Sequence, residues 1–126
     1  MHGITAEIAL EGATKTVAIN KAPFAGRVVS VAYIPNATIT GKATDFRTLS
    51  IVNKGAAGEG ATTVASQAFS EAGKKIAAFV AGSIPLSETA ANLLVKEGDV
   101  LVFGSALSGK GIVDPGGAIV VTLARS

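Results

Sequence analysis

The chain has 126 residues, of which 48% are hydrophobic and 16% are charged, and this apolar composition excludes an intrinsically disordered protein. The net charge of +2 is too small for a protein that binds nucleic acid electrostatically, and the absence of cysteine excludes disulfides, thiolate zinc sites and cysteine nucleophiles. We expect one domain with a single core and with part of its apolar surface buried against partners.

No segment of the sequence predicts contact with a membrane or with nucleic acid. No apolar run approaches the roughly 20 residues that span a bilayer, and the first residues lack the basic and apolar regions of a signal peptide. The longest basic run is Lys74-Lys75, and no aromatic residue stands beside a basic cluster. We expect a protein that is made in the cytoplasm and is not exported by the Sec route.

Residues 1–25 predict either a strand or an extended arm. Apolar Ile4, Ala6 and Ile8 alternate with other residues, which is the period of a strand with one buried face, and the alternation continues at residues 17–19. The alternative is an arm that pairs with the sheet of another subunit, because chain ends are ordered only when something holds them. Residues 26–126 are expected to form the main sandwich.

Residues 26–34 form the most strand-like run of the first half. Apolar side chains occur on both faces of this predicted strand, so we expect it to lie centrally between two packed layers. One face carries Val29, Val31 and Tyr33, and the other carries Val28, Ala32 and Ile34.

Two strands joined by a long loop are predicted in the middle of the chain. Residues 45–53 alternate between polar and apolar and predict a half-exposed strand. Residues 62–69 resume this character, with Val64 on one face and Phe69 on the other. The intervening residues include three glycines and show no periodicity, which indicates a loop.

The stretch 71–82 fits a helix and a strand equally well. Ile76, Phe79 and Val80 have helical spacing, but two glycines interrupt the pattern. The following residues 84–87 contain a proline and predict an edge strand or the start of a turn.

The last third predicts a turn, a strand, a loop and a final strand. β-forming residues occupy 99–104 and 118–124. Asp99, in the turn before the first of these strands, is expected to accept hydrogen bonds from backbone amides. In total we expect roughly eight short strands separated by turns, a rhythm typical of a sandwich or barrel.

No motif in the sequence predicts catalysis or cofactor binding. Residues 104–110 have the spacing of a phosphate-binding loop, but Gly111 stands where a serine or threonine must hold magnesium. The carboxylates of Glu97 and Asp99 are two residues apart on a turn and therefore splay, and His2 is the sole histidine. We expect no enzyme activity, no catalytic residue, no cofactor, no metal and no small-molecule substrate. The loop acids, which lack the spacing of a calcium site, are Asp45, Glu59 and Asp114.

Four stretches of the sequence combine strand and turn residues. They are residues 22–35, from Ala22-Pro23-Phe24 to Ile34-Pro35, residues 46–55, from Phe46-Arg47 to Lys54-Gly55, residues 97–101, beginning Glu97-Gly98-Asp99, and Asp114-Pro115-Gly116-Gly117. Together they resemble small structural proteins of tailed bacteriophages, namely head decoration or minor capsid proteins with a jelly-roll β-sandwich. The likeness covers about residues 22–124, and the residues before it carry no match.

The resemblance implies an all-β, jelly-roll-like antiparallel β-sandwich of roughly eight strands. It also implies a structural virion protein that binds the outer surface of the major capsid protein lattice as decoration or cement, bridges capsid subunits and stabilises the head. Such a protein is made in the host cytoplasm, lies on the capsid exterior and self-associates, with a trimer favoured. The residues that we expect to contact partners are His2, Ile4, Ala6, Ile8, Lys21, Phe24, Lys54 and Lys110.

The alternative is a jelly-roll module of a phage fibre that binds a receptor or a carbohydrate. Sugar sites commonly use exposed aromatic rings, and the chain has no tryptophan and one tyrosine. The two hypotheses predict different copy numbers in the virion, hundreds for a decoration protein and a handful for a fibre tip.

Overall fold

The computed structural model of the protein describes residues 2–8, 15–40, 46–70, 75–108 and 116–125. These residues form short strands, a 3₁₀ helix and connecting turns, which agrees with the all-β prediction. The strands are β1 (His2–Ile8), β2 (Lys15–Lys21), β3 (Gly26–Pro35), β4 (Ile39–Thr40), β5 (Phe46–Asn53), β6 (Thr62–Ala68), β7 (Lys75–Ile76), β8 (Gly82–Ser83), β9 (Leu94–Val95), β10 (Val100–Ser108) and β11 (Gly117–Arg125), and the helix is η1 (Ala90–Leu93).

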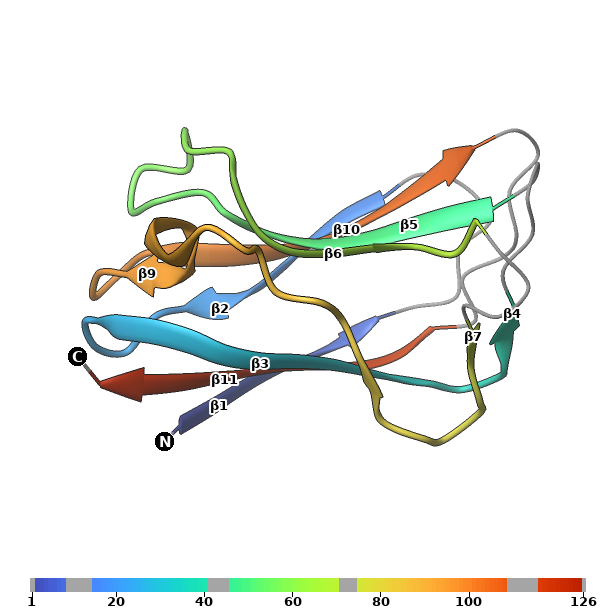
Figure 1. Cartoon of the computed structure of the whole chain (residues 1–126). Helices are drawn as coiled ribbons and strands as arrows, with labels where there is room; N and C mark the ends of the chain where they lie inside the picture. The colour runs from blue at the N-terminus through green and yellow to red at the C-terminus, as the bar shows by residue number, and fades with distance from the viewer. Residues whose placement is uncertain (1, 9–14, 41–45, 71–74, 109–115, 126) are drawn as a thin grey trace.

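The strands form two facing antiparallel sheets, seen as the upper and lower layers of Figure 1. One sheet has the order β1-β11-β3-β8, with β9 also paired to β3, and the other has the order β2-β10-β5-β6. Apart from β9, these sheets contain eight strands, and along the chain the first of the eight pairs with the last (β1 with β11), the second with the seventh (β2 with β10), the third with the sixth (β3 with β8) and the fourth with the fifth (β5 with β6). This is the strand order of a jelly roll, so the predicted fold is confirmed.

The N-terminal segment is a strand of its own chain. β1 pairs with β11 over seven residues, from His2 opposite Leu123 to Ile8 opposite Gly117. β2 pairs with β10 in the other sheet. Of the two alternatives for residues 1–25, the strand is therefore the one observed.

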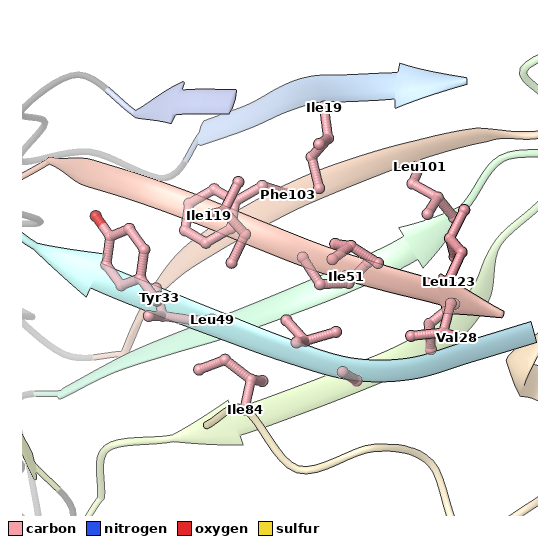
Figure 2. Packing of buried hydrophobic residues seen from close by; sticks show 14 of the residues in the cluster. Ile19, Val28, Tyr33, Leu49, Ile51, Ile84, Leu101, Phe103, Ile119 and Leu123 are labelled. Atoms are coloured by element: carbon pink, nitrogen blue, oxygen red, sulfur yellow. The ribbon is translucent and has the colours of Figure 1, made fainter. Parts of the chain in front are cut away.

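Side chains from both sheets fill the space between the layers (Figure 2). Tyr33 of β3 and Phe103 of β10 are fully buried and their rings meet in the core, with centroids 5.5 Å apart and ring planes tilted by 33°. Alternate residues of β5, Leu49 and Ile51 among them, point into the same core. Each such aliphatic or aromatic side chain contributes about 1.5–3 kcal/mol by leaving water.

The two faces of β3 are divided differently from the prediction. The buried set is Val28, Val31 and Tyr33, whereas Val29 is half-buried. The pairing with β11 shifts register between Thr122, opposite Ser30, and Leu123, opposite Val28. Val29 is therefore the extra residue of a bulge, and the alternation of buried and exposed side chains is interrupted there. The expectation that β3 lies between two packed layers is also wrong, because its outer face is partly exposed.

The hairpin of β5 and β6 is present, but the predicted faces of its second strand are wrong. Val64 and Phe69 are both buried. The β5–β6 pairing shifts register between Ile51 and Val52, and Phe69 lies just beyond the end of β6, so simple alternation does not connect the two residues.

Residues 84–87 link the two sheets along one side of the sandwich. The N–H of Ile84 donates to the carbonyl of Val31 in one sheet, at 2.9 Å. In the other sheet, the N–H of Ser66 donates to the carbonyl of Pro85 at 3.0 Å and the N–H of Ser87 donates to the carbonyl of Val64 at 2.8 Å. The predicted edge segment is therefore confirmed, and it covers the free edge of β6.

The ambiguous stretch 71–82 contains no helix in its described part. Residues 75–76 pair with β4, and residues 82–83 pair with β3. A turn connects the two short strands. Residues 71–74 lie outside the described residues.

Candidate functional site

The turn before β10 is built around the carboxylate of Asp99. Its Oδ2 accepts hydrogen bonds from the backbone N–H of Lys96 at 2.9 Å and from Nδ2 of Asn53 at 3.1 Å. Gly98 has a positive φ of 91°, and the N–H of Asp99 donates to the carbonyl of Lys96 at 3.0 Å, as in a type II turn. The predicted turn and the predicted role of Asp99 as an acceptor are confirmed.

Asn53 extends this network to the loop after β5. Its side chain is almost fully buried, and its Oδ1 accepts a hydrogen bond from the N–H of Gly55 at 2.8 Å. The N–H of Lys54 donates to the carbonyl of Val100 at 2.8 Å. Because Asp99 is engaged in holding these loops while Glu97 is exposed, the arrangement serves structure and does not favour acid–base chemistry by the two carboxylates.

A shallow cavity of about 270 Å³ lies beside this turn. It is lined by Lys21, Ala22, Pro23, Glu97 and Gly98. Ligand pockets are commonly about 300–1,000 Å³ and mainly apolar or aromatic. With one lysine, one glutamate and no aromatic ring, this cavity has neither the size nor the lining of such a pocket.

The described residues bring together no group of three or more histidine, cysteine, aspartate or glutamate side chains that could hold a metal ion. Among the loop acids, Glu59 is exposed, whereas Asp45 and Asp114 lie outside the described residues. No helix in the described part of the chain is long and apolar enough to span a membrane.

A buried arginine in the core was not predicted from the sequence. Arg47 of β5 is fully buried, and its Nη1 donates a hydrogen bond at 2.8 Å to Oγ of Ser105, which is also buried. Arg47 lies on the same face of β5 as Leu49 and Ile51. The alternation of the strand was therefore a signal that could have placed it inside.

The outer face of the sheet β2-β10-β5-β6 carries three neighbouring cross-strand rows without a charged or aromatic side chain. We call these residues the outer rows. Their side chains are small or β-branched, so each exposes little apolar area. The outer rows are Thr16-Gly104-Ser50-Ser66, Ala18-Val102-Val52-Thr63 and Ala106-Thr48-Ala68.

Three large apolar side chains of the described residues are exposed: Phe79 at 74%, Val80 at 54% and Leu94 at 57%. Phe79 and Val80 are adjacent in the turn between β7 and β8, and we call this pair the apolar tip. Phe79 has a left-handed backbone, with φ of 60°. For a residue other than glycine this conformation costs about 1–2 kcal/mol.

The sequence did not predict the apolar tip, because its phenylalanine and valine fit the spacing of a helix face. The available signal was the pair of glycines around it. They leave a segment too short for a stable helix, so its apolar residues cannot form a helix face that packs on the core. The exposure of Leu94, the first residue of the two-residue strand β9, was also not predicted from the sequence.

The predicted contact residues lie in separate places. Lys21 is exposed at the end of β2, opposite Val100, and the N–H of Lys54 donates to the carbonyl of Val100, so these two lysines lie at the same end of the sandwich. Phe24 is buried, with the guanidinium of Arg125 4.4 Å from its ring centroid, and has little surface to offer. His2, Ile4, Ala6 and Ile8 lie in β1, and Lys110 lies outside the described residues.

No known protein family matches the chain, and searches of curated proteins and of solved structures found no match to it.

Proposed function

We propose that the chain is a structural virion protein that binds the outer surface of an assembled capsid as decoration or cement and bridges neighbouring major capsid subunits. The observation that carries this proposal is a jelly-roll sandwich whose exposed large apolar side chains include an adjacent pair on one anchored turn. The likeness of residues 22–124 to head decoration proteins is the second support.

The physical demands of this role are modest. A cement protein needs a rigid body, a contact patch and many copies, because weak contacts add when they are repeated along a lattice. The two sheets supply the rigid body, and the network of Asn53 and Asp99 ties down the loops at one end. Self-association, with a trimer favoured, increases the number of contacts that one bound oligomer makes with the capsid.

A second candidate is a receptor- or carbohydrate-binding module of a phage fibre. The exposed ring of Phe79 favours it, because sugars stack on exposed aromatic faces. The sole tyrosine, Tyr33, is fully buried and adds nothing to such a surface. A single exposed ring on the described surface gives this candidate less support than the decoration role.

The copy number of the chain in purified virus particles tests the proposal. We expect hundreds of copies per particle, measured by quantitative mass spectrometry against the major capsid protein. A handful of copies would indicate a fibre component, and absence from the particles would refute a virion role. Sedimentation of the purified protein checks the expected trimer.

A further inference from the structure

The apolar tip is held by three hydrogen bonds that backbone N–H groups of its turn donate. The N–H of Ala78 donates to Oγ1 of Thr38 at 3.1 Å, and the N–H of Phe79 donates to the carbonyl of Pro35 at 2.8 Å. The N–H of Val80 donates to the carbonyl of Ala77 at 3.1 Å. Because Pro35 ends β3, the tip is attached directly to a long strand of the sandwich (Figure 1, yellow turn after β7).

Packing beneath the turn fixes it further. Ile76 is paired with Ile39, and both side chains are buried. A Cβ atom at Gly82 would lie 2.5 Å from Cγ1 of Ile76, so glycine is needed for the isoleucine to pack there. The tip is therefore presented in one conformation before any partner arrives, which lowers the entropy cost of binding.

Two features of Phe79 are unfavourable for the stability of the chain on its own. Its backbone is left-handed, and 74% of its side chain is exposed. Glycine at this position would adopt the same φ without strain and would expose no ring. Stability of the isolated chain therefore does not account for a phenylalanine here, whereas contact with a partner does.

We propose that the apolar tip inserts Phe79 into an apolar pocket on the outer surface of the major capsid protein, an inference that rests on the function proposed above. An aromatic side chain buries about 150–250 Å², so the tip offers on the order of 200 Å², against the roughly 800 Å² per partner of a stable one-to-one complex. An anchor of this size fits a partner that repeats its pocket in fixed geometry, as a capsid lattice does.

The cavity described beside the Gly98 turn makes a second copy of the chain a poor receptor for the tip at that site. The cavity beside the Gly98 turn is lined by the charged Lys21 and Glu97. A phenyl ring placed there would displace water from both charges without replacing its hydrogen bonds.

Binding to capsids that lack the chain tests this assignment. The probe is a particle purified after deletion of the gene, to which the intact purified protein is added back at increasing concentration. We expect Phe79→Ala to weaken binding about 10- to 100-fold, as for a hot-spot residue. Leu94→Ala removes another exposed apolar side chain, 57% exposed against 74% for Phe79, and is expected to change binding less than about twofold.

Thermal unfolding of Phe79→Gly supplies an independent readout. We expect the melting temperature to rise by about 2–4 °C, because relief of the left-handed strain exceeds the entropy that glycine adds to the unfolded chain. The same variant should bind the capsid as weakly as Phe79→Ala. A variant that is more stable and yet fails to bind separates a partner contact from a structural role.

The outcomes are distinct. If the wild-type protein binds the particles and Phe79→Ala binds equally well, the tip assignment is wrong while the proposed function stands. If the wild-type protein does not bind, the proposed function fails and the tip assignment fails with it. Binding of the wild-type protein to a glycan array and not to the particles, lost in Phe79→Ala, would assign the tip to the carbohydrate module. A Phe79→Gly protein that is less stable than wild type would overturn the argument from strain.

Discussion

Replacing Ser105 by alanine tests the buried hydrogen bond that joins β5 to β10. The side chain of Arg47 is fully buried, and its Nη1 donates a hydrogen bond to the Oγ of Ser105 at 2.8 Å. Alanine deprives this charged donor of the hydroxyl acceptor at a site from which water is excluded. Hydrogen bonds to charged groups contribute about 1.5–3 kcal/mol, so we expect the free energy of unfolding to fall by about 2 kcal/mol.

Urea denaturation followed by far-ultraviolet circular dichroism measures this change, since the chain has no tryptophan to report by fluorescence. The slope of the transition should stay constant while its midpoint falls, and the melting temperature should drop by about 6–12 °C. Ser66→Ala is the matched control, because Ser66 is exposed on β6. It should change stability by less than about 0.5 kcal/mol.

A double-mutant cycle isolates the contact from the other interactions of Arg47. In an Arg47→Met background, Ser105→Ala should cost less than about 0.5 kcal/mol, because the donor has already been removed. Other contacts of Arg47 are lost in both arms and cancel. A coupling energy below about 0.5 kcal/mol would refute the view that this hydrogen bond stabilises the core.

Two further substitutions test the core strand and the turn. Leu101→Asp should unfold the domain, because it removes a fully buried leucine worth about 1.5–3 kcal/mol and buries an unpaired charge at a further cost of several kcal/mol. Ala106→Asp, on the exposed face of the same strand, should fold, and circular dichroism of the two proteins would show it; a folded Leu101→Asp protein contradicts the inward placement. Asp99→Ala should lower the free energy of unfolding by about 1–2 kcal/mol, because the two hydrogen bonds to its carboxylate are lost. Glu97→Ala is the control and should lower it by less than about 0.5 kcal/mol. Urea denaturation measures both changes, and equal losses would rule out a structural role specific to Asp99.

Strands with one buried face were predictable from the sequence. In β5 the alternation of apolar and polar residues reflects a direct physical demand, because one face lies in the core and the other does not. The turn at residues 97–99 was predictable for the same kind of reason, since glycine and aspartate meet its backbone requirements. The jelly-roll order came from resemblance, because pairing between distant strands leaves no local signal.

Register shifts explain most of the errors. A bulge moves every side chain beyond it to the other face, and no residue type announces it, so Val28 and Val29 were exchanged in the prediction. The apolar tip was hidden for a different reason. Periodicity assumes that apolar residues seek the core, and Phe79 and Val80 do not.

The outer rows help to explain why the chain carries so little charge. Their uncharged side chains occupy a sheet face, whereas about 25–35% charged residues is the level aimed for on soluble designed surfaces. Such an uncharged face can approach a neighbouring copy without burying a charge, but its small side chains cannot fill a pocket. The apolar tip differs because it carries an aromatic ring that is 74% exposed. We therefore expect the tip to determine attachment to the capsid, and the outer rows to determine only how closely neighbouring copies pack.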